Sequence, residues 1–191
     1  MTDLQTAKNN LDGHTICLCK DGKCLFSEKR GIAPMMEFIA EAKDLSGYSV
    51  ADLVVGKAVA LLFVKCKIKR VFAKTLSESA KRVLLLYGVD YEYETLTEKI
   101  INLDGTDICP MEKAVSDTDD IEEAYLILQS KLNQLRQNKY KKALQAQSLF
   151  AYSNCRIKSN RLFIFLTPNE NGVDGFQKWK PTALLWALRF L

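Results

Sequence analysis

Several motifs by which a reaction can be identified are absent from this sequence of 191 residues. Histidine occurs once, at position 14, so a catalytic triad built on it has no support in the sequence. Neither glycine-rich phosphate-binding motif occurs, whether Gly-x-Gly-x-x-Gly or Gly-x-x-x-x-Gly-Lys followed by a hydroxyl residue. No two cysteines have the Cys-x-x-Cys spacing typical of structural zinc sites. We therefore expect no metal site and no cofactor, and interpret Cys17, Cys19 and Cys24 as small hydrophobic residues of strands.

The sequence also lacks the signals of export and of membrane insertion. Its first 13 residues are polar, and the longest apolar run, 50–64, contains Asp52 and Lys57 and is too short to span a bilayer. These features predict a cytoplasmic protein that does not bind membranes. Six cysteines in such a protein are expected to be free thiols rather than a disulfide framework.

The charge is distributed unevenly, which predicts two parts. The formal net charge is +4, but residues 1–136 carry 18 Lys+Arg against 21 Asp+Glu, whereas residues 137–191 carry nine against two. We expect one α/β domain over 1–136 and a basic extension over 137–191, with a strand at 161–167 and a helix at 182–191. The extension either packs on the domain or is not its native continuation. It contains no nucleic-acid recognition motif, so a nucleic acid is not an expected partner.

Hydrophobic periodicity and turn residues predict a mixed sheet covered by helices on both faces. An Asp21-Gly22 turn indicates a hairpin, Pro34 suits the first turn of a helix, and Ser77 is a typical N-cap residue. The expected elements are a hairpin at 15–26, helices at 32–43, 49–66 and 77–87, strands at 69–75 and 91–94, a short strand at 100–101, and further helices from 110 and from 120.

The first candidate site lies in the expected helix 49–66, where Asp52 and Gly56 would share one face and Lys57 would lie beside them. Two interpretations are open. Lys57 extends to solvent while Asp52 caps the helix, or Gly56 allows a ligand or a backbone segment to approach while Lys57 binds an anion or acts as a base.

The second candidate site is the segment from Asn102 to Glu112. Pro110 suits a first helical turn, which places Cys109 at the N-cap, where the positive helix end would lower the pKa of its thiol. The alternative is a buried, inert cysteine. Ser77 and Glu78 begin another helix in the same way. In α/β sheets such helix starts gather at the carboxyl edge of the strands, where ligands bind.

Four motifs in this order resemble a bacterial family known as domain of unknown function 1893. They are Arg30-Gly-Ile-Ala-Pro34, Ala51-Asp-Leu-Val-Val-Gly-Lys-Ala58, Thr75-Leu-Ser-Glu-Ser-Ala80 and Ile108-Cys-Pro-Met-Glu112. The resemblance implies a cytidine-deaminase-like, three-layer α/β/α fold with a mixed sheet. Zinc deaminases carry His/Cys-Ala-Glu and Pro-Cys-x-x-Cys at two helix starts. The corresponding segments here, Val50-Ala-Asp52 and Cys109-Pro-Met-Glu112, contain one potential zinc ligand, so zinc-assisted deamination is not supported.

The resemblance leads to two functional hypotheses. The first is a zinc-less domain, a transferase or hydrolase if it is an enzyme, that binds a small anionic or nucleotide-derived ligand. In it Cys109 is the nucleophile or a redox-sensitive thiol, Lys57 the anion contact or base, and Glu112 an orienting carboxylate. The expected ligand-binding residues are Asp52, Gly56, Ser77, Glu78 and Asn102. The alternative is a non-enzymatic ligand-binding or protein-interaction module, and homo-oligomer formation stays open in both.

Overall fold

The structure is a computed structural model that describes residues 1–158, with side chains described up to residue 147. The strand expected at 161–167 and the helix expected at 182–191 lie outside the described residues. The first of two compact units comprises Met1–Leu144. Among the described helices, none is both long and apolar enough to cross a membrane.

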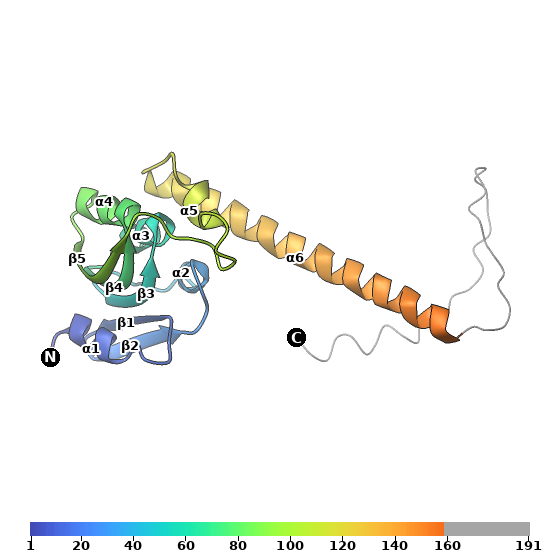
Figure 1. The fold of residues 1–191 in the computed structure, drawn as a ribbon. Coiled ribbons are helices and arrows are strands. Elements are labelled where there is room, and N and C mark those ends of the chain that lie inside the picture. Colours follow the sequence, from blue (N-terminus) through green and yellow to red (C-terminus); the bar gives the residue numbers. More distant parts are fainter. Residues whose placement is uncertain (159–191) are drawn as a thin grey trace. The chain divides into compact units, whose positions relative to one another are not determined.

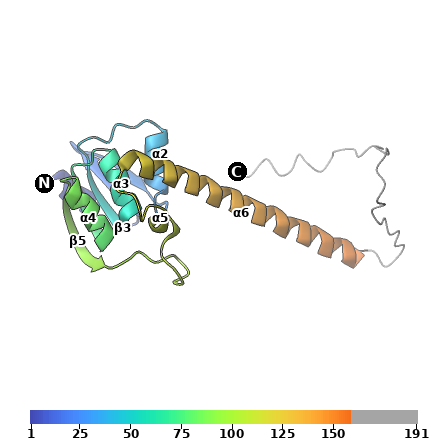
Figure 2. The same ribbon diagram turned by 90° about the horizontal axis from the view of Figure 1, so that it is seen from above.

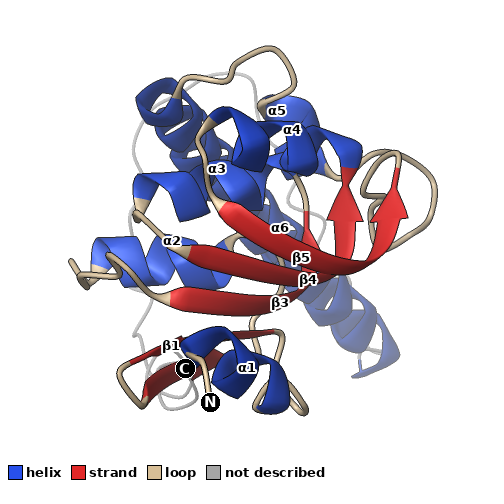
Figure 3. Ribbon diagram, turned by 90° about the vertical axis from the view of Figure 1, so that its left-hand side faces the viewer, coloured by secondary structure: helices blue, strands red, loops and turns tan. Residues whose placement is uncertain are grey.

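A five-stranded mixed sheet forms the centre of this unit, in the order β2-β1-β3-β4-β5 (Figure 3). β1 is antiparallel to both of its neighbours, β2 and β3, whereas β3, β4 and β5 are parallel. The mixed sheet is therefore as predicted. The strands are β1 (Ile16–Lys20), β2 (Lys23–Ser27), β3 (Ser49–Val55), β4 (Arg70–Ser77) and β5 (Asp90–Thr97).

Helices cover both faces of the sheet, which gives the predicted three-layer α/β/α architecture (Figure 1). α1 packs on one face, against β1 and β3, while α3 and α4 lie side by side on the other (Figure 2). α6 joins the core on the α3 side through Ala124 and Leu128. The helices are α1 (Asp3–Asn9), α2 (Ala33–Ala40), α3 (Lys57–Lys65), α4 (Glu78–Leu86), α5 (Pro110–Ala114) and α6 (Ile121–Lys158).

The hairpin and the start of α4 confirm two predictions from turn and cap residues. Asp21 and Gly22 form the β1–β2 turn with φ of 50° and 75°, the left-handed conformation that a tight hairpin turn requires. Ser77 caps α4, because its Oγ accepts a hydrogen bond from the backbone N of Ala80 at 3.1 Å. The helix ends at Leu86, shortly before Gly88, as expected.

The prediction of a helix over 49–66 is wrong in its first half. Ser49–Val55 is strand β3, and the helix begins only at Lys57, with Gly56 as its N-cap. β3 lies between β1 and β4 and is covered on both faces, so its apolar residues form a continuous run without strand alternation. Asp52 therefore lies on a strand, and its expected helical relation to Gly56 does not exist.

The expectation that all six cysteines are free thiols is also wrong. Cys19 and Cys24 face each other across the hairpin and form a disulfide, whereas Cys17, Cys66 and Cys109 are free. Directly paired residues of antiparallel strands are close enough for such a bond. Free thiols were expected because the sequence has no export signal. The absence of such a signal does not tell whether two cysteines face each other across a hairpin.

Helix α1 was not predicted, because most of the first 13 residues are polar. Three apolar positions nevertheless form a buried stripe at helical spacing, made by Leu4, Ala7 and Leu11. Thr2 caps the helix by accepting a hydrogen bond from the backbone N of Gln5 at 3.2 Å. This short stripe covers Cys17, Cys19, Ala51 and Phe72 in a second, smaller core.

If α1 closes that face of the sheet, Leu4→Ala will lower the free energy of unfolding by about 2–4 kcal/mol, as expected for truncating a buried leucine. Urea denaturation of the full chain, followed by circular dichroism, measures this. Gln5→Ala is the matched control, because Gln5 is exposed on the same helix and should change stability little. Equal effects of the two substitutions would show that α1 does not contribute to the core.

Candidate functional site

The carboxylate of Glu112, in α5, is the centre of the candidate site. Its side chain is buried, and its Oε1 accepts hydrogen bonds from the backbone N of Lys57 at 3.2 Å, Ser77 Oγ at 2.8 Å and Ser79 Oγ at 2.6 Å. Oε2 accepts one from the backbone N of Ile100 at 3.0 Å. One side chain thus joins the start of α3, the start of α4 and the segment after β5.

The sheet topology explains why these parts meet. β3 and β4 are adjacent and parallel, so they end at the same edge of the sheet, and each passes almost directly into a helix. Only Gly56 separates β3 from α3, and Ser77 is both the last residue of β4 and the N-cap of α4. The starts of α3, α4 and α5 lie together at the carboxyl edge. The prediction is confirmed for the starts at Ser77 and Pro110, whereas the start expected at 49–52 is wrong, because α3 begins at Lys57.

Two side chains crowd Gly56. A Cβ atom at position 56 would lie 3.2 Å from Glu112 Oε2 and 3.1 Å from Ile100 Cγ1, so glycine lets both approach without displacement. The backbone of Gly56 is extended, with φ of −94° and ψ of 175°, so conformation alone does not require glycine here. The sequence predicted the approach of a ligand or of backbone, whereas the groups that approach Gly56 in the structure are side chains of the protein itself.

Glu112 also takes the place of an N-cap residue for α3. Gly56 has no side chain to offer, so the amide of Lys57 is satisfied by a carboxylate 55 positions further along the chain. The first N–H groups of a helix lack intrahelical partners and favour negative charge. This is the position at which folds of this kind bind anionic ligands. Here Glu112 occupies it.

The side chain of Lys57 makes contacts that neither interpretation of the sequence predicted. Its side chain is only 8% exposed, its Nζ donates to the carbonyl O of Ser116 at 2.8 Å, and it pairs with Asp119 Oδ1 at 2.9 Å. The lysine therefore neither extends freely to solvent nor faces an open anion site. It ties α3 to the loop between α5 and α6.

Cys109 lies where the sequence placed it, at the N-cap of α5. It is partly buried, its backbone N donates to the carbonyl O of Ile100 at 2.8 Å, and its side chain makes no capping hydrogen bond. α5 has only five residues, so few aligned peptide groups contribute a dipole at its start. The backbone of Cys109 fixes the position of α5, and the structure does not test a role for its thiol.

Asp52 lies on β3, with Ile16 and Ala73 as its partners in the neighbouring strands. Its side chain is buried, and its Oδ1 accepts a hydrogen bond from the backbone N of Val54 at 3.0 Å. Burial raises the pKa of this carboxyl to about 7, because removal from water disfavours its charged form. Within the described residues, no cation pairs with it.

The remaining two expected ligand-binding residues do not reach Glu112. Glu78 is exposed in the first turn of α4. Asn102 shapes a loop instead, because its Oδ1 accepts from the backbone N of Thr106 at 3.0 Å and its Nδ2 donates to Thr106 Oγ1 at 3.2 Å. Leu103, the next residue, is 85% exposed.

The structure thus brings together four of the predicted residues, Gly56, Lys57, Ser77 and Glu112. Two residues that were not predicted, Ser79 and Ile100, also contact Glu112. The repeated serine in Ser77-Glu-Ser79 at a helix start was an available signal for the first of them. Nothing in the sequence indicates that the amide of Ile100 would meet a carboxylate.

Two shallow hollows on the described surface lie at the other edge of the sheet, where β4 and β5 begin. Both include Arg70 and Leu4, and one of them also includes Asp90, Tyr91 and Glu92. None of the predicted site residues lines either hollow.

If Glu112 holds the carboxyl edge together, Glu112→Ala will lower the free energy of unfolding by about 3 kcal/mol or more, because four donors lose their partner. Ser79→Ala should cost about 1 kcal/mol, since it removes one of the four hydrogen bonds. Glu78→Ala, which removes an exposed carboxylate nearby, is the control and should be close to neutral. Similar losses for Glu112→Ala and Glu78→Ala in urea denaturation would contradict this account.

The buried carboxyl of Asp52 predicts a pH dependence of stability. Its pKa is about 7 in the folded state against an ordinary value of 3.8, so the native state retains a proton that the unfolded chain releases. The free energy of unfolding therefore falls as the pH rises from about 4 to about 7, and this contribution is constant at higher pH.

Asp52→Asn keeps the acceptor for Val54 and cannot ionise. Between pH 4.5 and pH 8, the free energy of unfolding of Asp52→Asn should rise by about 2–4 kcal/mol relative to that of the unmodified chain. Urea denaturation across this range measures the difference. A difference that does not depend on pH would show that Asp52 titrates as an ordinary aspartate.

Solved structures similar to this chain include a DUF1893 family protein from Thermotoga maritima. It is 29% identical, the match covers 69% of this chain and 91% of that one, and the TM-score is 0.63. Among curated proteins, none matches the chain.

Two deaminases are similar more distantly. A dCMP deaminase from the cyanophage S-TIM5 is 13% identical over 47% of this chain and 92% of its own, with a TM-score of 0.35. A diaminohydroxyphosphoribosylaminopyrimidine deaminase/5-amino-6-(5-phosphoribosylamino)uracil reductase from Thermotoga maritima is 14% identical over 47% of this chain and 34% of its own, with a TM-score of 0.33. These two likenesses are too distant to bear on chemistry.

The model of the family described as "Domain of unknown function (DUF1893)" matches residues 7–132, which span well over half of the chain. This range contains the four motifs that suggested the resemblance, as well as Glu112 and all of its hydrogen-bond donors. The chain therefore belongs to the DUF1893 family.

Proposed function

We propose that this chain is a non-enzymatic ligand-binding or interaction module, in which the carboxyl edge of the sheet is closed by the protein's own Glu112. The observation that carries the proposal is the set of four hydrogen bonds received by the buried Glu112 carboxylate. They support a structural role for the residue that the sequence made a candidate for catalysis.

A general base must be within hydrogen-bond reach of the proton that it abstracts, so a substrate needs access to one of its oxygen atoms. Oε1 of Glu112 already accepts from three donors and Oε2 from the amide of Ile100, and the side chain is 7% exposed. Releasing even one hydrogen bond to such a group costs about 1.5–3 kcal/mol. Catalysis by Glu112 would therefore require the local structure to open first.

The other two candidate catalytic residues give no better support to a reaction. The Lys57 ammonium is held between the Ser116 carbonyl and the Asp119 carboxylate, so it is not available to an incoming anion. A cysteine nucleophile needs an adjacent base. In the described part of the chain, the Cys109 thiol has no hydrogen-bonded partner, and Glu112, on the next turn, accepts from other groups.

A small anionic ligand at this edge would have to compete with the Glu112 carboxylate for the same donors. A carboxylate in the same chain has a high effective concentration, so a dilute external anion competes poorly. The proposal therefore places any ligand or partner elsewhere on the domain. A small-molecule ligand and a cytoplasmic location stay predictions from the sequence.

A ligand screen with turnover measured on every hit tests the proposal. Nucleotides, nucleosides and small carboxylates are added to the full chain, thermal shift reports binding, and chromatography of each hit after incubation reports chemistry. We expect no conversion of any hit, and equal thermal shifts for the unmodified chain and for Cys109→Ser, because the thiol does not take part.

Conversion of a hit that is lost in Cys109→Ser or in Lys57→Met, with the fold intact by circular dichroism, would overturn the proposal in favour of a zinc-less enzyme. Cys66→Ser is the matched control for the thiol. It removes another partly buried free cysteine, at the end of α3, away from the Glu112 network.

A further inference from the structure

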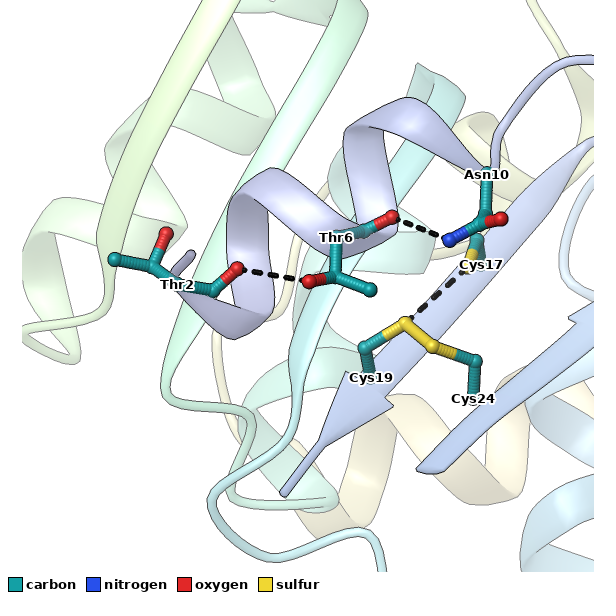
Figure 4. Close-up of a disulfide and its surroundings, with 6 residues drawn as sticks. All are labelled: Thr2, Thr6, Asn10, Cys17, Cys19 and Cys24. Atoms are coloured by element: carbon teal, nitrogen blue, oxygen red, sulfur yellow. Dashed lines mark hydrogen bonds between the residues drawn. A yellow bond between two sulfur atoms is a disulfide. The ribbon is translucent and has the colours of Figure 1, made fainter. Parts of the chain in front are cut away.

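Three cysteine sulfur atoms gather on the face of the sheet covered by α1, apart from the Glu112 edge (Figure 4). Cys17 Sγ lies 3.6 Å from Cys19 Sγ, Cys19 is joined to Cys24, and all three sulfur atoms lie within 4.8 Å of one another. We propose that, when the Cys19–Cys24 disulfide is reduced, Cys17, Cys19 and Cys24 form a binding site for a Cu(I) ion.

The strand register creates this cluster. Cys17 and Cys19 are two residues apart on β1 and so project from the same face, and Cys24 is the direct partner of Cys19 on β2. The sulfur positions therefore depend on the β1–β2 hairpin at the edge of the sheet, and not on a loop. A site built on strands holds its ligands more accurately than one built on loops.

The donor set points to a soft cation of low coordination number. In the described residues, the cluster contains three cysteines and no histidine, aspartate or glutamate. Thiolates select soft ions such as Cu(I), and structural zinc almost always requires four ligands. Three sulfur atoms without a histidine or carboxylate beside them therefore favour Cu(I) over Zn(II).

Two polar side chains lie near the cluster, Thr6 of α1 and Asn10, the C-cap residue of that helix. Thr6 Oγ1 donates to the carbonyl O of Thr2 at 3.2 Å, and Asn10 Nδ2 donates to the carbonyl O of Thr6 at 2.8 Å (Figure 4). Their remaining acceptors are hydroxyl and amide oxygen atoms, which are hard ligands that a soft ion such as Cu(I) does not favour. The other neighbours of the sulfur atoms, in the smaller core, are apolar, including Leu11 and Ala51.

One of the three cysteines gives solvent access to a cluster that is otherwise buried. Cys17 and Cys19 are fully buried, whereas Cys24 is partly exposed on the edge strand β2 and offers a path to the sulfur atoms.

The redox step needs an external dithiol. The dithiol transfers two electrons and two protons to the Cys19–Cys24 disulfide and is itself oxidised to a disulfide. The Cys19–Cys24 bond breaks, and Cys19 and Cys24 become thiols. Cu(I) then binds the three sulfur atoms, and each sulfur that binds as a thiolate releases one proton to solvent. Exchange with an external disulfide, which is reduced to its dithiol, re-forms the Cys19–Cys24 bond, removes two of the three ligands and releases the ion.

The test uses the full chain, reduced with a dithiol that is then removed under anaerobic conditions. Cu(I) is added as its acetonitrile complex, and affinity is measured by competition with a chromogenic Cu(I) chelator. We expect about one high-affinity Cu(I) per reduced chain, an X-ray absorption spectrum dominated by sulfur neighbours, and affinity at least about tenfold lower in the oxidised chain.

Substitutions identify the ligands. Cys17→Ser and Cys24→Ser should each lower the affinity at least about tenfold, whereas Cys66→Ser and Cys109→Ser, which remove free cysteines elsewhere, should not. Cys24 is partly exposed, so its variant keeps the test valid if Cys17→Ser fails to fold. Affinity unchanged in Cys24→Ser, or lowered equally in Cys66→Ser, would overturn the proposal, as would Zn(II) binding tighter than Cu(I).

Discussion

The hydrogen bonds around the Glu112 carboxylate join parts of the chain that are far apart in the sequence. They link α5 to the first turns of α3 and α4 and to the segment that leaves β5. Because a buried acceptor and its donors must all find partners, these segments are expected to form and to separate together. The absence of a side chain at Gly56 and the ion pair of Lys57 with Asp119 both serve this arrangement.

The same arrangement decides what the domain can do at the carboxyl edge of its sheet. In α/β folds this edge is where helix starts and strand ends receive ligands. Here four donors at this edge bind the Glu112 carboxylate of the same chain. The position where such folds usually bind a ligand is therefore filled by a side chain of the protein. The chemically distinctive groups lie instead under α1, where the hairpin places three sulfur atoms on one face.

Local signals in the sequence were sufficient for much of the fold. The Asp21-Gly22 turn, the Ser77 cap and Pro34 in the first turn of α2 were interpreted correctly, because each acts within a few residues. Strand β3 was mistaken for a helix because burial on both faces removes the alternation by which strands are recognised. Its β-branched residues, Val50, Val54 and Val55, were the available contrary signal.

The site was predicted only as far as topology allows. Adjacent parallel strands had to bring Gly56 and Ser77 to one edge, so their proximity could be inferred. That Glu112 turns inward to the amide of Lys57, and that the Lys57 side chain meets Ser116, depends on contacts 55 and 59 positions apart in the chain. Single-sequence patterns carry no information on such pairs.

The central claim is that Glu112 is an internal anion that completes the carboxyl edge of the sheet. Thermal unfolding of Glu112→Gly, with and without added formate, tests it most directly, because formate can supply the missing carboxylate to the vacated donors. The account predicts that formate raises the Tm of this variant more than that of the unmodified chain, and more than equimolar chloride does. An equal response of both proteins to formate would contradict it.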